Sequence, residues 1–572
     1  MKAVIVGGVA GGASAAARLR RLDEHAEIIM LERSGYVSYA NCGLPYYVGG
    51  VITQKSALTL QTPESFRSRF GIDVRTRQEA VAIDPVGHTV TVRRLEDGET
   101  YTESYDKLIL SPGARPAVPD LPGVQSSRVF TLRTVEDTER IHAFVQSRRP
   151  KTALVVGGGY IGVEMAENLT HLGLQVTLAE LAPQILAPLD YDMACSVQTY
   201  LQEQGVELHL GAALQSLEET EWGMAAQFDG GAVRNADLVL LAVGVRPDTA
   251  LAADAGLALG RGGAILVDDH MKTSAPDIYA VGDAVEVRQF VSQQPTLLPL
   301  AGPANKQGRI AADNICGRDS AYRGTQGSSI VRVFGMTAAS TGLNEKTAQA
   351  AGLSYDKVVL LSADHATYYP GAQNMTLKVL FSPETGKLLG AQIVGFQGVD
   401  KRIDVLASAI RAGMDAADLA ELELAYAPPY SSAKDPVNMA GFVMGNVLDG
   451  LVRQFHWHDV ADLPRESVTL LDVRTPAEFA RGHISGAVNI PLDSLRHHLA
   501  QLDPEKPVYV NCHSGLRSYL ACRILAQRGF DCYNLSGGYH FYSSVYSGQT
   551  DHAPTHPCGV RIEWKQQTPA GQ

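Results

Sequence analysis

The stretch "TALVVGGGYIGVEMAENLTHLGLQVTLAE", residues 152–180, decides the fold of this chain. It reads as a strand, a glycine turn, a helix and a second strand. Gly157, Gly159 and Gly162 match the glycines of the GxGxxG pattern, and Glu180 ends the second strand. Such glycines let the backbone approach a pyrophosphate at the helix N-terminus, while the acid binds ribose hydroxyls. The stretch therefore predicts a βαβ unit that binds a dinucleotide.

The same pattern occurs once more at the N-terminus, in "KAVIVGGVAGGASAAARLRRL", residues 2–22. Gly7 and Gly12 fit the first and third glycines and Glu32 is the acid, but Val9 takes the place of the second glycine. One imperfect match is weak evidence. Two units about 150 residues apart favour two dinucleotide sites, the alternative being one working unit and one decayed copy.

The residues after Glu180 indicate which nicotinamide nucleotide binds. They are Leu181, Ala182 and Pro183, without an arginine or lysine to hold a 2′-phosphate. We therefore expect NADH rather than NADPH.

Two further turns fit a flavoenzyme. "YDKLILSPGARP" (105–116) predicts a strand that ends in a Ser-Pro-Gly turn, and "TSAPDIYAVGDAVEV" (273–287) a strand that runs into Gly282 and Asp283. In an enzyme with two dinucleotide units, an aspartate at this place binds the ribityl chain of the flavin. An ordinary helix N-cap is the alternative for Asp283.

This order of motifs resembles the pyridine nucleotide-disulfide oxidoreductase superfamily over about residues 1–449. The resemblance implies an α/β protein with a Rossmann-like FAD domain (1–111 and 251–324), a Rossmann-like NAD(H) domain (112–250) and an α+β dimerisation domain (325–449). A homodimer is implied with them. The implied FAD and NAD contacts are Gly7, Gly8, Ala10, Gly11, Gly12, Glu32, Arg33, Ser111, Gly113, Gly157, Gly159, Tyr160, Ile161, Gly162, Glu180, Gly282 and Asp283.

A single cysteine follows the first βαβ unit, in "SYANCGLPYYVGG" (38–50). The dithiol class of these enzymes has cysteines five residues apart, but here Val37 and Tyr47 stand five residues from Cys42. A local disulfide is excluded, so Cys42 would cycle through a mixed disulfide, a persulfide or a sulfenic acid. Such chemistry favours an exposed turn and a thiolate of low pKa.

The same stretch resembles the single-cysteine branch of the superfamily, and specifically the coenzyme A-disulfide reductases; NADH oxidases and peroxidases share this branch. "ATYYPGA" (366–372) and "AYAPPYSSAKDPVNM" (425–439) resemble its tyrosine motifs. The resemblance implies that Tyr368 and Tyr426 of the other subunit hydrogen-bond near the sulfur; interface aromatics are the alternative. The implied coenzyme A contacts are Ser14, Arg18, Arg21, Ser38, Asn41, Asn305 and Lys434. For the two arginines, a solvated basic helix face is the alternative.

The C-terminal part carries a second cysteine chemistry. "VTLLDVRTPAEFARGHISGAVNIPLDSL" (468–495) and "VYVNCHSGLRSYLACRILAQRGF" (508–530) resemble an α/β rhodanese domain, which we place with a C-terminal tail at 450–572. A strand ends at Cys512, and the next residues curl towards its sulfur before a helix begins. The backbone amides and helix dipole there would hold an anionic persulfide, with Arg517 closing the ring. Cys522 and Cys532 are expected to be structural.

Composition and residue spacing argue against a nucleic-acid-binding, membrane-spanning or metal-binding protein. A net charge of −12 argues against nucleic acid as a partner, and no apolar run is long enough to span a membrane. The seven cysteines include Cys558, form no CxxC pair and favour a reducing cytoplasm. No metal site is predicted, because His456 and His458 have no third ligand nearby in the sequence.

Together these features predict an enzyme that uses FAD and NADH, with coenzyme A as bound thiol. It would reduce persulfides, polysulfides or coenzyme A disulfide through Cys42, while Cys512 handles sulfane sulfur. Two alternatives remain open at this point. One is an NADH oxidase or peroxidase, and the other is a redox or sulfide sensor.

Overall fold

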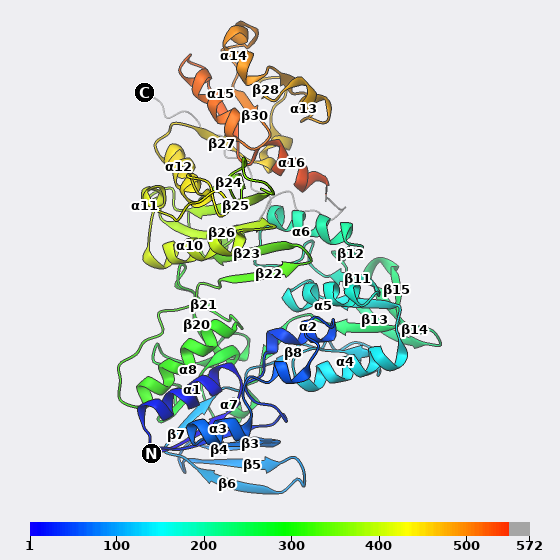
Figure 1. Cartoon of the computed structure of the whole chain (residues 1–572), viewed down its shortest axis with the longest axis vertical. Coiled ribbons are helices and arrows are strands. Elements are labelled where there is room, and N and C mark those ends of the chain that lie inside the picture. Colours follow the sequence, from blue (N-terminus) through cyan, green and yellow to red (C-terminus); the bar gives the residue numbers. More distant parts are fainter. Residues whose placement is uncertain (548–572) are drawn as a thin grey trace. The chain divides into compact units, whose positions relative to one another are not determined.

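The computed structural model describes residues 1–547, so Cys558 and the end of the predicted rhodanese segment lie outside the described residues. The chain forms two compact units (Figure 1). Among the described residues, the first contains residues 1–181 and 205–327, and the second contains residues 182–204 and 328–547. Residues 182–204, placed by the sequence in the NAD(H) domain, thus group with the second unit. The boundaries of the four domains given in the sequence analysis remain predictions.

The first unit contains a parallel sheet built from both ends of its chain. In spatial order its strands are β19 (Ile278–Ala280), β7 (Lys107–Leu110), β1 (Lys2–Val6), β2 (Glu27–Glu32) and β3 (Asp73–Thr76). Helices α1 (Ala10–Leu22) and α8 (Ala301–Ile315) pack against each other beside it (Figure 1). Because β19 returns after the second βαβ unit, this unit is inserted, as the order of motifs predicts.

A second parallel sheet carries the inserted βαβ unit. Its strands are β12 (Glu207–Leu210), β11 (Gln175–Glu180), β10 (Thr152–Val156), β16 (Leu238–Leu241) and β9 (Val129–Phe130), with α5 (Tyr160–His171) after β10. Both Rossmann-like folds are therefore confirmed.

The two glycine turns show why the glycine pattern is needed. A Cβ atom on Gly12 would lie 1.9 Å from the carbonyl oxygen of Gly7, and one on Gly162 would lie 1.9 Å from that of Gly157. These distances leave no room for a side chain. A Cβ on Gly159, by contrast, would meet nothing within 4 Å. The mismatch at Val9 in the first unit is therefore compatible with the fold, because the second glycine serves ligand approach rather than packing.

The second unit contains the α+β dimerisation fold. Its antiparallel sheet has the order β22 (Ser329–Val333), β23 (Met336–Gly342), β26 (Leu388–Gly395), β25 (Asn374–Phe381) and β24 (Asp356–Ala363). Helices α10 (Val399–Ala412) and α12 (Pro436–Leu448) accompany it, with α11 (Ala416–Glu421) packed on α12 (Figure 1).

The same unit contains the rhodanese fold, a parallel sheet with helices around it. The strand order is β27 (Arg453–Phe455), β31 (Cys532–Leu535), β30 (Val508–Asn511), β28 (Thr469–Asp472) and β29 (Val488–Asn489). Its helices include α13 (Pro476–Ala480), α14 (Leu492–His498), α15 (Leu516–Ala526) and α16 (Gly538–Ser547).

A buried ionic network joins the parts of the second unit. The fully buried Lys378 amine lies 2.9 Å from Asp190, 2.8 Å from Asp192 and 2.5 Å from Glu345. The indole N–H of Trp457, at the start of the rhodanese fold, donates to Asp192 over 3.0 Å. Asp190 and Asp192 stand at the start of α6 (Tyr191–Glu203). One lysine thus holds together α6, the dimerisation sheet and, through Asp192, the rhodanese fold.

Backbone groups of β24 also reach the rhodanese fold. β24 is an edge strand, and unpaired edge groups need partners when they are buried. The Val359 N–H donates to the Ser536 hydroxyl over 3.1 Å, and the Lys357 carbonyl accepts from the Gln454 side chain over 3.2 Å. The rhodanese domain therefore covers this sheet edge.

Replacing Lys378 by Met should strongly destabilise the second unit. Asp190 and Asp192 would lose their buried lysine partner, while Glu345 would keep only Lys357, and breaking such a buried pair costs about 3–5 kcal/mol. Thermal unfolding followed by circular dichroism checks this, with the exposed Lys387→Met as matched control. Equal unfolding temperatures for the two variants would contradict the role given to Lys378.

Candidate active sites

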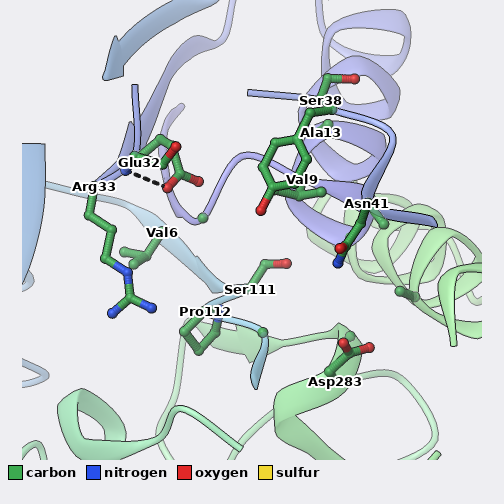
Figure 2. Close-up of a pocket in the computed structure, with 18 of the residues that line it drawn as sticks. Val6, Val9, Ala13, Glu32, Arg33, Ser38, Asn41, Ser111, Pro112 and Asp283 are labelled. Atoms are coloured by element: carbon green, nitrogen blue, oxygen red, sulfur yellow. Dashed lines mark hydrogen bonds between the residues drawn. The ribbon is translucent and has the colours of Figure 1, made fainter. Parts of the chain in front are cut away.

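A cavity of about 1030 Å³ in the first unit collects most of the residues predicted to bind cofactor or coenzyme A (Figure 2). The predicted residues that line it are Gly7, Ala10, Gly11, Ser14, Arg21, Glu32, Arg33, Ser38, Asn41, Cys42, Ser111, Gly113, Gly282, Asp283 and Asn305. Glu32 and Arg33 lie on one side of the view, and Ser38 and Asn41 lie on the other. The cavity thus connects the first glycine turn with the segment of the single cysteine.

Other predicted residues lie elsewhere. Gly8 and Gly12 shape the first turn without lining the cavity. Arg18 pairs with Asp313 over 2.7 Å and is largely buried, so its charge is compensated, and of the two predicted arginines only Arg21 lines the cavity. Gly157, Gly159, Tyr160, Ile161, Gly162 and Glu180 belong to the second βαβ unit, and Tyr368, Tyr426 and Lys434 to the second unit of the chain.

The acid at the end of each second strand closes its glycine turn. Glu32 accepts hydrogen bonds from the N–H groups of Gly8 (2.8 Å) and Ser34 (2.9 Å), and Glu180 accepts one from Gly158 (2.5 Å). Burial raises the pKa of Glu32, although both backbone donors oppose this. These shared contacts explain why both units carry the acid at the same relative position.

The cavity fits an FAD molecule. A Cβ on Gly7 would lie 2.0 Å from the Ser111 carbonyl oxygen, so two backbone turns meet without side chains between them. The N-terminus of α1 and Arg133 offer donors to a pyrophosphate, and Glu32 offers an acceptor to ribose. Arg133, which donates to Asp283 over 2.5 Å, was not predicted, because no motif marks it.

Cys42 lies exposed in the wall of this cavity, on the short 3₁₀ helix η1 (Asn41–Gly43) before α2 (Leu44–Val48). The surrounding wall reduces its hydration and raises its pKa, and the negative charge of Glu164 raises it further, while Arg133 lowers it. This direction is opposite to the low pKa that the sequence led us to expect. Burial in the cavity wall is the main cause, and Glu164, which comes from a helix distant in the chain, adds to it.

Glu164 is a functional candidate that sequence reasoning missed. It lies on α5, where its carboxylate accepts a hydrogen bond from the Tyr46 hydroxyl over 3.1 Å. Burial raises the pKa of Glu164 to about 7. A Cβ on Gly49 would lie 2.1 Å from the Asn168 amide oxygen, so α2 and α5 are in close contact. The inserted βαβ unit thus touches the helix that follows Cys42.

The two predicted tyrosines lie together on the second unit. Their hydroxyls are 2.5 Å apart, and the side chains of Tyr368 and Tyr426 are 72% and 46% exposed. The hydrogen bond with Tyr426 raises the pKa of Tyr368. Buried Arg402 fixes both loops, because it donates to the Asp364 carbonyl (2.8 Å) and pairs with Asp435 (3.0 Å). No local motif identifies Arg402 in the sequence.

Cys512 lies at the end of β30, beneath the N-terminus of α15. The Gly515 N–H and the Ser518 hydroxyl lie 3.2 Å and 3.3 Å from its sulfur. Backbone and hydroxyl donors therefore face the sulfur, as the loop predicts. Cys522 and Cys532 are buried on α15 and β31.

Two features are absent from the described part of the chain. Residues 1–547 contain no cluster of three His, Cys, Asp or Glu side chains arranged to hold a metal. Within that same range, none of the helices has the length and apolar character needed to cross a membrane.

The two dinucleotide folds, the cavity beside the first glycine turn with its one cysteine and the rhodanese fold together define a flavin-dependent NAD(P)H:disulfide oxidoreductase with a rhodanese-like domain. Residues 1–308 match the family model "Pyridine nucleotide-disulphide oxidoreductase", residues 328–436 its dimerisation domain and residues 458–544 the rhodanese-like domain. The chain belongs to the pyridine nucleotide-disulphide oxidoreductase family.

Three of the proteins to which it is similar illustrate the relationship. The coenzyme A disulfide reductase of Staphylococcus haemolyticus is 37% identical over 442 residues, which are 77% of this chain and 98% of that protein. The structure of reduced Bacillus anthracis CoADR-RHD has a TM-score of 0.94 and 48% identity, covering 96% of this chain and 98% of that one. The NAD-dependent persulfide reductase from A. fulgidus has a TM-score of 0.89 and 38% identity, covering 95% and 100%.

Replacing Glu164 by Gln should make Cys42 more acidic. Removing a negative charge beside a thiol stabilises the thiolate, so the pKa of Cys42 should fall by up to about one unit. The rate of Cys42 alkylation by iodoacetamide against pH, read by peptide mass spectrometry, measures this. Glu221→Gln, an exposed acid of the same inserted segment, serves as control. An unchanged dependence of the alkylation rate on pH would contradict the electrostatic coupling between Glu164 and Cys42.

Proposed function

We propose that this protein uses NADH to reduce persulfides, polysulfides and coenzyme A disulfide, releasing sulfide or coenzyme A thiol through Cys42. The observation that carries this proposal is one exposed cysteine in the wall of the cavity that would hold FAD. None of the other described cysteines lines this cavity. A thiol from outside the chain is therefore the natural disulfide partner of Cys42.

The names of similar proteins support this substrate class. A coenzyme A disulfide reductase matches the chain over 442 residues, and an NAD-dependent persulfide reductase matches nearly the whole chain. The two relatives differ in how much of this chain they cover, 77% for the coenzyme A disulfide reductase and 95% for the persulfide reductase, and this chain carries a rhodanese-like domain at residues 458–544. A domain that handles sulfane sulfur suits a persulfide substrate better than a plain disulfide.

The cavity residues divide into two groups in this proposal. Glu32, Arg133, Asp283 and the N-terminus of α1 would hold FAD, and Arg21, Ser38 and Asn41 would contact coenzyme A. Bound FAD would supply two-electron transfer between the reduced nicotinamide and sulfur. The second βαβ unit would bind NADH at its glycine turn, with Glu180 for the ribose.

Cys42 carries the sulfur chemistry. Its thiolate attacks the inner sulfur of a persulfide RSSH, so that a Cys42–S–S–R bond forms and hydrosulfide leaves with the electrons of the broken bond. Two electrons, supplied overall by NADH, then cleave the mixed disulfide into the Cys42 thiolate and RS⁻. In the overall reaction, NADH, H⁺ and RSSH are converted to NAD⁺, RSH and H₂S. With coenzyme A disulfide, coenzyme A thiolate leaves instead.

A homodimer would complete the site. Tyr368 and Tyr426 are exposed on a dimerisation fold, where a second copy can receive them. A tyrosine hydroxyl is protonated at neutral pH, so the pair could donate a proton to the departing thiolate. Lys434, on the same segment as Tyr426, would contact a phosphate of coenzyme A.

Cys42→Ser should abolish NADH-dependent sulfide release from coenzyme A persulfide, because no thiolate remains to form the mixed disulfide. Anaerobic assay of sulfide by methylene blue and of NADH by absorbance checks this. Cys512→Ser should retain reduction of coenzyme A disulfide. Sulfide production that survives Cys42→Ser, or oxygen consumption as fast as thiol-substrate turnover, would reject the proposal.

Replacing Tyr368 and Tyr426 together by Phe should lower kcat for coenzyme A disulfide by about 100-fold, because proton donation is lost. KM should change little. Steady-state kinetics give both constants, and Tyr430→Phe, an exposed tyrosine of the same segment, is the control. An unchanged kcat in the double variant would contradict proton donation by the two tyrosines and would favour a role as aromatic residues of the dimer interface.

A further inference from the structure

The loop that holds Cys512 contains an arginine whose charge is already neutralised. We propose that Glu478 sets the substrate class of the rhodanese site: it makes the loop accept sulfane sulfur from organic persulfides and disfavour inorganic dianions such as thiosulfate. This inference rests on the proposed function, because it specifies which donor loads the sulfur that the enzyme handles.

The contact between Glu478 and Arg517 is bidentate. The two terminal nitrogens of Arg517 donate to the two carboxylate oxygens of Glu478 over 2.8 Å and 2.6 Å. The Thr475 N–H and hydroxyl donate to the same carboxylate over 2.9 Å and 2.8 Å. These donors hold the pKa of Glu478 well below its usual range, first through Arg517. The carboxylate is therefore ionised and fixed at neutral pH.

Other charged groups near the loop are compensated in the same way. The groups close enough to shift the pKa of His513, a loop residue, are Glu478, Arg517 and Arg474. Arg474 is buried in a pair with Asp472 over 2.6 Å. Burial lowers the pKa of His513, so its ring is neutral at pH 7. Two arginines thus face two carboxylates, and these side chains add no net positive charge.

The helix after Cys512 offers apolar surface instead. Leu516 belongs to the loop and Leu520 follows it by one helical turn on α15; both side chains are exposed. A persulfide with an organic body can contact these leucines, whereas thiosulfate presents only oxygen and sulfur. The Gly515 N–H and Ser518 hydroxyl remain as donors for the single charge of a persulfide.

The two donors react in balanced steps. With an organic persulfide, the Cys512 thiolate attacks the terminal sulfur of RSS⁻, forming Cys512–S–S⁻ and releasing RS⁻. With thiosulfate, the same attack breaks the sulfur–sulfur bond and sulfite leaves with its electrons. The second reaction brings a dianion to the loop, so it alone needs uncompensated positive charge.

The test compares two donors in the full-length protein without NADH, so that the reductive cycle at Cys42 cannot turn over. Sulfur transfer to cyanide is followed as thiocyanate, with thiosulfate or N-acetylcysteamine persulfide as donor. Glu478→Gln frees the charge of Arg517 and should raise kcat/KM for thiosulfate at least about fivefold, an increase that salt should reduce. The value for the persulfide should stay within about twofold.

Two further variants make the result decisive. Glu505→Gln removes an exposed acid elsewhere in the domain and should leave kcat/KM unchanged for both donors. Glu478→Asp keeps the charge but shortens the side chain, so it should raise thiosulfate use less than Glu478→Gln. Unchanged thiosulfate kinetics in Glu478→Gln, or an equal loss with both donors, would overturn the inference. Because the Cys42→Ser assay is separate, each proposal can fail alone.

Discussion

Direct backbone contact between the glycine turns and their helices is the constraint on which the site depends. The carbonyl of Gly7 would lie 1.9 Å from a Cβ on Gly12, and the carbonyl of Gly11 would lie 2.2 Å from one on Gly308. Helix α1 is thereby pressed against both the first turn and α8. This contact brings Ser14 to 2.5 Å from Asn305, and both line the cavity that holds Cys42. Side chains at these glycines would separate the elements that form the cavity.

The second unit depends on a comparable arrangement around β24. Val359 on this strand donates to Ser536, which directly precedes the turn that packs against the Cys512 loop. At its other end, β24 leads within five residues to Tyr368. The rhodanese loop and the tyrosine loop are therefore attached to one strand, and the Lys378 network secures the same fold. The loops that carry Cys512 and Tyr368 therefore share one supporting strand within this unit.

The sequence predicted what depends on local spacing. Glycine turns with a following acid identify Rossmann-like folds, and the strand–cysteine–helix order of the 508–530 stretch identifies the rhodanese loop. The sequence did not predict the roles of Arg133, Glu164 and Arg402, or the pairing of Glu478 with Arg517. Each of these residues acts on a partner that is distant in the chain. Arg18 illustrates the same limit: the resemblance implied a coenzyme A contact, but Asp313, 295 residues away, pairs with this arginine. A residue pair that forms only through tertiary packing leaves no periodic pattern.

The central claim is that Cys42 uses a thiol from outside the chain as its disulfide partner. Non-reducing peptide mass spectrometry of the full-length protein, after exposure to coenzyme A disulfide, measures this most directly. The account predicts a coenzyme A adduct on the peptide that contains Cys42, which dithiothreitol or NADH removes. A disulfide between Cys42 and another cysteine of the chain, or an unmodified Cys42 peptide, would contradict it.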